Sequence, residues 1–145
     1  MTYCTIIDEE TFLGASNCVT MKLPPMVRRI EDLRDMPKVE GLRIPSTCTG
    51  NTDGNLYIRM FDSLNLLVID GTIDELNMDE QGGRFTAPTN IVINGLVNKI
   101  VVQGKNYTTW GGTIWVDDVD VYRAKSGFSS YTSNLSPISS MPVAL

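Results

Sequence analysis

Two segments of this chain follow nearly the same pattern: residues 67–77 read LVIDGTIDELN, and residues 91–101 read IVINGLVNKIV. The second segment lies 24 residues after the first, and Asp70-Gly71 aligns with Asn94-Gly95. The aligned apolar pairs are Leu67/Ile91, Val68/Val92, Ile69/Ile93, Ile73/Val97 and Leu76/Ile100. Self-similarity at a fixed spacing of this size is typical of stacked structural repeats.

Weaker copies flank this pair. A third copy, IWVDDVDVY, occupies residues 114–122, about 23 residues further on, and a fainter one, GLRIPS, occupies residues 41–46. Between residues 42 and 125, short apolar runs alternate with Gly, Asn and Asp, a texture typical of β-structure. We therefore predict a mainly β core over residues 41–125, built of repeats of about 23–24 residues.

Two architectures can use such a repeat, and the first is a short parallel β-solenoid. Each repeat is then one rung, and Asp-Gly or Asn-Gly forms a corner, so that equivalent residues stack in columns. The predicted columns are Leu67/Ile91/Ile114, Val68/Val92/Trp115, Ile69/Ile93/Val116 and a polar corner of Asp70/Asn94/Asp117. A solenoid requires this agreement between rungs, so the sequence favours it.

The alternative is an antiparallel β-sandwich or barrel in which the Asp-Gly and Asn-Gly pairs are hairpin turns. A hairpin at Asp70-Gly71 sets Leu67 opposite Asp74, which is a poor cross-strand pair. Antiparallel sheets are nevertheless the commoner kind. We favour the solenoid and keep the hairpin architecture as its alternative.

One short helix is expected, over residues 26–36. Apolar residues recur there at helical spacing with charges on the other face, and Pro24-Pro25 and Pro37 bound the segment. The apolar positions are Met26, Val27, Ile30, Leu33 and Met36.

The chain reads as a single β domain over residues 1–145, with an N-terminal arm or cap over 1–40 and a Ser-rich arm over 126–145. The last rung of a solenoid leaves backbone groups and an apolar face uncovered, so each end needs a cap or a partner. We expect the Ser-rich arm to cover one end, either on its own domain or held by a neighbouring subunit. Its candidate contact residues are Phe128, Tyr131, Leu135 and Ile138.

The composition excludes several classes of function. The net charge of −5 gives no electrostatic reason to bind nucleic acid or an anionic membrane. Histidine is absent and only three cysteines are present, so we expect no metal site and no cofactor. Cys4, Cys18 and Cys48 are expected to be free and mostly buried. The first residues show no signal-peptide pattern, which indicates synthesis in the cytoplasm.

Acidic residues gather around the repeat corners. They are Asp70, Asp74, Glu75, Asp79 and Glu80, followed by Asp117, Asp118 and Asp120. Paired carboxylates serve glycoside hydrolases or bind calcium, but the repeat itself accounts for these acids as turn and corner residues that favour positive φ. Residues 51–55, NTDGN, resemble a calcium loop only superficially and are interpreted as a tight loop.

Aromatic residues suggest a contact surface. Tyr107 and Trp110 are the candidates for an exposed interface or ligand surface, because they lie in a Thr- and Gly-rich loop. Trp115 falls in an apolar column and is expected to pack in the core.

The function hypothesis that follows is a non-enzymatic structural or assembly protein. It would act as a homo-oligomer, for example a trimer, in a larger protein assembly such as a capsid shell, as a capsid-decorating or tail component of a virion. The first alternative is a carbohydrate- or ligand-binding β module that uses Tyr107 and Trp110. The second is a small carbohydrate-active enzyme with paired carboxylates.

Overall fold

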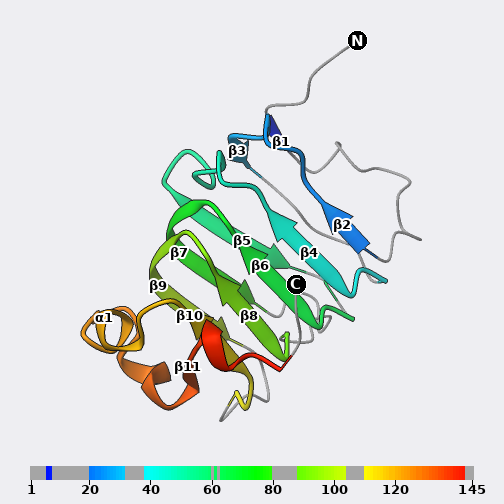
Figure 1. Cartoon of the computed structure of the whole chain (residues 1–145). Coiled ribbons are helices and arrows are strands. Elements are labelled where there is room, and N and C mark those ends of the chain that lie inside the picture. Colours follow the sequence, from blue (N-terminus) through cyan, green and yellow to red (C-terminus); the bar gives the residue numbers. More distant parts are fainter. Residues whose placement is uncertain are drawn as a thin grey trace.

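The computed structural model describes residues 6–7, 20–31, 38–59, 61, 63–79, 88–103 and 110–142. The chain forms a parallel β-solenoid of about 4 turns with ~24-residue repeats (Figure 1). Every strand pair in these described ranges is parallel. The solenoid prediction is therefore confirmed, and the antiparallel alternative is wrong.

Two sheets face each other along the stack. The larger has six strands in the order β11-β10-β8-β6-β4-β2: β2 Thr20–Lys22, β4 Gly41–Ile44, β6 Leu66–Ile69, β8 Asn90–Ile93, β10 Thr113–Val116 and β11 Leu135–Pro137. The smaller has three strands: β5 Asn55–Arg59, β7 Thr72–Asp79 and β9 Leu96–Gln103. A further pair joins β1 Ile6–Ile7 to β3 Arg29–Ile30. The described helical segments are α1 Val119–Arg123 and the 3₁₀ turns η1 Ser129–Asn134 and η2 Ile138–Ser140.

The register of the larger sheet matches the predicted columns. Leu67 pairs with Ile91, which pairs in turn with Ile114. The faint copy at residues 41–46 is a rung as well, since Leu42 pairs with Leu67. The second inner column of the larger sheet is Ile44/Ile69/Ile93/Val116. Like residues stack on like, so neighbouring rungs bury one continuous apolar interior.

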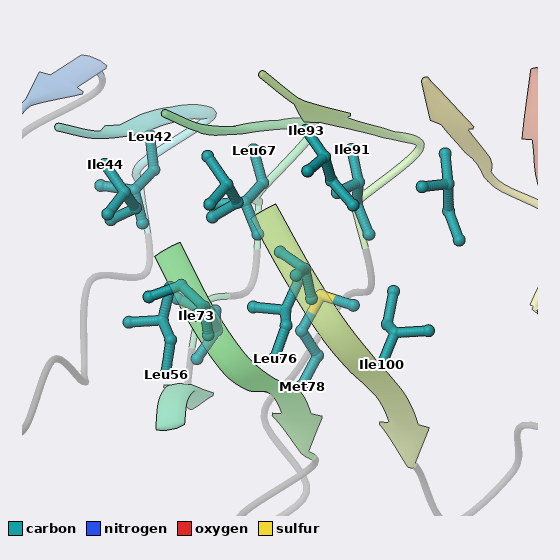
Figure 2. Close-up of a cluster of buried hydrophobic side chains, with 14 of the residues drawn as sticks. Leu42, Ile44, Leu56, Leu67, Ile73, Leu76, Met78, Ile91, Ile93 and Ile100 are labelled. Carbon is teal, nitrogen blue, oxygen red and sulfur yellow. The ribbon is translucent and has the colours of Figure 1, made fainter. Parts of the chain in front are cut away.

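The core lies between the two sheets. Figure 2 shows Leu42, Leu67 and Ile91 extending from the larger sheet toward Leu56 and Leu76 of the smaller one. All of these side chains are almost completely buried. The columns of the smaller sheet are Leu56/Leu76/Ile100 and Ile58/Met78/Val102.

One predicted column faces away from the core. Val68 pairs in register with Val92, and Val92 pairs with Trp115, as expected. Alternation along a strand turns them to the outer face, and neither valine belongs to the core cluster although both are buried. Trp115 is partly exposed, and its indole N–H donates to Asn90 Oδ1 at 2.9 Å. The expectation that Trp115 packs in the core is therefore wrong.

Close approach between rungs explains the corner glycines. The Leu96 N–H donates to Gly71 O at 3.0 Å, as the Thr72 N–H does to Cys48 O one rung earlier. A Cβ on Gly95 would lie 2.5 Å from Asp70 O, which no side chain tolerates. The expectation of positive φ at the corners is wrong for these glycines, since among the described residues the glycines with positive φ are Gly50 and Gly54.

The predicted helix at residues 26–36 is wrong over its described part. Arg29–Ile30 is strand β3, the Ile30 N–H donates to Gly50 O, and Arg28 O accepts from the Thr49 N–H. Val27 and Ile30 are buried as the pattern required, but an extended backbone satisfies that burial equally well. Pairing with β1 and hydrogen bonds to residues 49 and 50 therefore decided the conformation. Residues 32–37 lie outside the described residues.

The weak copy at residues 114–122 is half strand and half helix. Strand β10 ends at Val116, and Asp118 then caps α1 by accepting from the Asp120 and Val121 N–H groups.

Among the residues that the structure describes, no helix has the length and apolar character needed to cross a bilayer.

Candidate functional site

The acidic corner residues are engaged in contacts between rungs. Asp70 accepts from Arg43 Nε at 2.6 Å on one side and from Asn94 Nδ2 at 2.8 Å on the other. The three side chains thus form a polar ladder across three consecutive rungs. Asp70 thus joins the rung before it to the rung after it, which is a structural role.

The environment of Asp70 keeps it ionised. Partial burial alone would raise the pKa of Asp70, but the hydrogen bonds from Arg43 and Asn94 and the positive charges of Arg43 and Lys22 outweigh it. The net result is a pKa below the ordinary value. A carboxylate held in this state is a poor proton donor, so Asp70 lacks the raised pKa that a general acid requires.

A second ladder runs beside the first. Asp74 Oδ1 accepts from Asn98 Nδ2 at 3.2 Å, and Asn98 Oδ1 accepts from Lys125 Nζ at 3.2 Å. On the outer face of the smaller sheet, Glu75 lies 3.4 Å from Lys99 Nζ. Asp74, Glu75 and Asp79 lie within strand β7, so the expectation that they are turn or corner residues is wrong for these three. The contacts of Asp74 and Glu75 nevertheless link neighbouring rungs.

The remaining acids and the 51–55 segment also have local roles. Asp118 caps α1, and Asp120 pairs with Arg123 at 3.2 Å. Asn51 Oδ1 accepts from the Asp53 and Asn55 N–H groups, as a tight loop requires. Glu80 and the side chain of Asp79 lie outside the described residues. No group of three or more potential metal ligands occurs in the described part of the chain.

Trp110 is buried rather than exposed, with 9% of its surface accessible. Its indole N–H donates to Pro88 O at 3.1 Å, and its ring meets Tyr131 edge-on at 6.2 Å. Gly112 makes room for the indole, since a Cβ there would lie 2.7 Å from Trp110 Nε1. The expectation of an exposed Trp110 is therefore wrong. Tyr107 lies outside the described residues.

The Ser-rich arm packs on its own domain. Phe128 is fully buried and meets Tyr122 edge-on at 5.0 Å. Leu135 begins β11, which extends the larger sheet beside β10, and Ile138 is partly buried. Asn134 fixes the arm by donating to Trp110 O at 3.1 Å and to Gly112 O at 2.8 Å. Figure 1 shows this part of the chain at one end of the stack.

Two tyrosine hydroxyls close the end of the smaller sheet. The Val97 N–H donates to the Tyr122 hydroxyl at 3.3 Å, and the Val102 N–H donates to the Tyr131 hydroxyl at 2.9 Å. Between them, the Ile100 N–H donates to Gly127 O at 3.1 Å. Burial raises the pKa of Tyr122, the Val97 N–H lowers it and Asp117 raises it, so the hydroxyl stays neutral. The repeat gives no signal for these contacts, because Tyr122 ends the weak third copy at a position where the stronger copies carry no tyrosine, and Tyr131 lies beyond that copy.

Cys48 is a free, fully buried thiol at the first corner. Burial raises the pKa of Cys48 and outweighs the hydrogen bond from the Gly50 N–H at 3.4 Å. A buried thiol with a raised pKa is a poor nucleophile. The expectation for Cys48 is confirmed, and Cys4 and Cys18 lie outside the described residues.

The outer face of the smaller sheet carries mixed polar and aromatic groups. The Arg59 guanidinium lies 4.5 Å over the Tyr57 ring, and Asn55 Nδ2 lies 3.4 Å from the Tyr57 hydroxyl. Arg59 Nε is buried without a hydrogen-bond partner. The stack of Arg59 on Tyr57 is a surface feature for which the sequence pattern carries no signal.

No protein family, no curated protein and no solved structure matches this chain. The assignment of function therefore depends on the chain's own geometry.

Proposed function

We propose that this protein is a non-enzymatic structural component that works as an oligomer within a larger protein assembly. The observation that supports this most is the continuous in-register stack from β2 to β11, closed at its C-terminal end by the chain itself. Such a stack is stiff, because each rung is held by its neighbours along its whole length.

The hydrogen bonds that the carboxylates make favour this proposal over a catalytic role. Asp70 and Asp74 are bound to side chains of neighbouring rungs, and Asp118 is bound to the first turn of α1. These contacts stabilise the stack. A catalytic pair of carboxylates would instead need one member with a raised pKa beside a substrate.

The proposed setting is a virion, with this chain as a capsid-decorating or tail component bound to a shell of other subunits and to copies of itself, for example as a trimer. A decorating component has a mechanical task, and a capped stack with a folded-back arm suits a mechanical task. Its low content of charged residues, 20%, suits extended contacts with other proteins.

The carbohydrate-binding alternative has lost its main support. It required Trp110 on the surface, and Trp110 is buried against Tyr131 and Pro88. We do not propose it further.

The test is the mass of the native protein in solution. Light scattering or native mass spectrometry at micromolar concentration is expected to give a discrete oligomer of fixed stoichiometry. A compact monomer over the whole concentration range would contradict the proposal. Tail proteolysis does not discriminate, because the arm already packs on its own domain.

A further inference from the structure

We infer that residues 119–137 are a terminator, a segment that stops a second copy of this chain from adding to the end of the solenoid. The inference goes beyond the proposed function, because it holds for a monomer and for an oligomer alike. If the protein is an oligomer, the terminator excludes contacts between copies through this end of the stack.

The edge that the terminator covers is long, and the cover is thin. Strand β9 runs from Leu96 to Gln103 and pairs with β7 along nearly its whole length. On its other edge, the terminator supplies one backbone bridge, between Lys99 and Gly127. Two further N–H groups of that edge, those of Val97 and Val102, donate to tyrosine hydroxyls.

A hydroxyl that accepts a hydrogen bond from the edge of a sheet ends the pairing there, whereas a strand in the same place would continue it. A strand that accepts from β9 offers its own N–H groups to the next strand, and growth can proceed. The hydroxyls of Tyr122 and Tyr131 accept the β9 hydrogen bonds and offer no further ladder. Gly127 allows the chain to pass close by, since a Cβ there would lie 2.7 Å from Lys99 Cα.

The larger sheet is ended by a different device. Strand β11 has only three residues, Leu135–Pro137, and its last residue has no N–H to donate. A short edge strand with proline is a poor template for further pairing. The two sheets are thus closed by the same segment in two ways.

A second copy of this chain is the partner that the uncovered rung would fit. The rung formed by β9 and β10 ends in the apolar columns of Ile100 and Ile114, which continue those of Leu76 and Ile91. Stacking in this fold requires like on like, and another copy carries the same columns at the same spacing.

The experiment removes the hydroxyls and keeps the rings. The double variant Tyr122→Phe/Tyr131→Phe is compared with wild type and with Tyr57→Phe, whose hydroxyl lies on the outer face of β5. Light scattering gives the mass and small-angle X-ray scattering the maximum dimension, both over a hundredfold range of concentration. We expect the mass of the double variant to rise with concentration to about twofold or more of the wild-type mass. The particle should become longer, as its maximum dimension shows, and should not become wider. Wild type and Tyr57→Phe should keep a constant mass.

A folded double variant that keeps the wild-type mass and dimension over this range would overturn the inference, and so would growth in width alone. If the double variant does not fold, the single variants are measured by hydrogen exchange with added wild-type protein. Each single variant is expected to expose the Val97 or Val102 N–H to exchange, and a second copy that pairs with β9 should protect it again at high protein concentration. An N–H that stays unprotected at high protein concentration overturns the inference. The wild-type mass alone tests the proposed function, so the two failures are distinguishable.

Discussion

Gly71 and Gly95 occupy equivalent corners, and their role comes from the rung next to them. The backbone of one corner passes so close to the next that a side chain has no room, as the Cβ positions show. Asp70 and Asn94 likewise act as a pair across rungs. At the scale of single residues, the meaning of a position is thus set by its column.

The first prediction concerns Gly95→Ala. The new Cβ would lie 2.5 Å from Asp70 O, so the corner must shift and the stack loosens. We expect a loss of about 1–3 kcal/mol in the free energy of unfolding. Gly111→Ala is the control, since nothing lies within 4 Å of its Cβ position, and should change stability by less than about 1 kcal/mol. Urea unfolding of both variants measures the difference, and equal effects would contradict the interpretation.

The second prediction concerns Asp70→Asn and pH. The pKa of Asp70 is lower in the folded chain than its unfolded value of about 3.9, so the unfolded state takes up the proton first as pH falls. Its contribution to stability is therefore present above about pH 4 and is lost below it, as pH falls through the lowered folded pKa. Asp70→Asn should flatten the stability curve in that window.

Thermal unfolding between about pH 2 and pH 6 provides the measurement. The control is Asp120→Asn, whose side chain is 92% exposed and which should leave the slope of the wild-type curve nearly unchanged. If stability fell with pH as steeply in Asp70→Asn as in wild type, the polar ladder of Arg43, Asp70 and Asn94 would not be the source of the pH dependence.

At the scale of elements, pairing with a neighbouring rung overrides local preference. The apolar spacing at Val27 and Ile30 fits a helix, yet β3 is a strand because β1 pairs with it and backbone groups of residues 49 and 50 hydrogen-bond to it. The Ser-rich arm shows the reverse case. Its composition suggests a loose tail, yet Phe128 and Leu135 bury enough apolar surface to hold it.

The third prediction concerns the attachment of the arm. Asn134→Ala removes the donor that binds Trp110 O and Gly112 O, which leaves both carbonyls without that partner. We expect local opening of the arm to increase about 5–30-fold. Native-state proteolysis measures the rate of cleavage after residue 128. The exposed neighbour in Ser133→Ala should behave as wild type, and equal rates in both variants would show that Asn134 does not fix the arm.

At the scale of the whole molecule, stability is a sum over neighbouring rungs. Equivalent residues of successive rungs pair at separations of about 24 residues, and the core is one continuous stack. An added rung with the same columns should therefore be accepted without a change of fold.

The fourth prediction is an inserted rung. A second copy of residues 72–95 placed after Gly95 should fold as one more turn and raise the urea m-value by about a sixth, in proportion to the added residues. An insert of equal length with Asn at its copies of Ile73 and Ile91 should give no such increase, because its columns are broken. Circular dichroism and urea unfolding test both chains, and an unchanged m-value for the intact insert would contradict the additive stack.

The sequence by itself determined the repeat, its spacing and the identity of the columns. Leu67, Ile91 and Ile114 share a column because rungs that touch only their neighbours must agree along the chain, and that agreement is visible in one dimension. The corner role of Asp70 and Asn94 followed from the same agreement.

Only the tertiary structure decided the contacts that do not recur from rung to rung. The strand at Arg29–Ile30, the burial of Trp110 and the closure of β9 by Tyr122 and Tyr131 all depend on groups that are distant in sequence and do not recur. Alternation placed Val68 and Val92 together, but only the packing of the sheets showed that they face outward. A repeat constrains its own contacts by symmetry, whereas its caps are particular contacts that no pattern along the chain specifies.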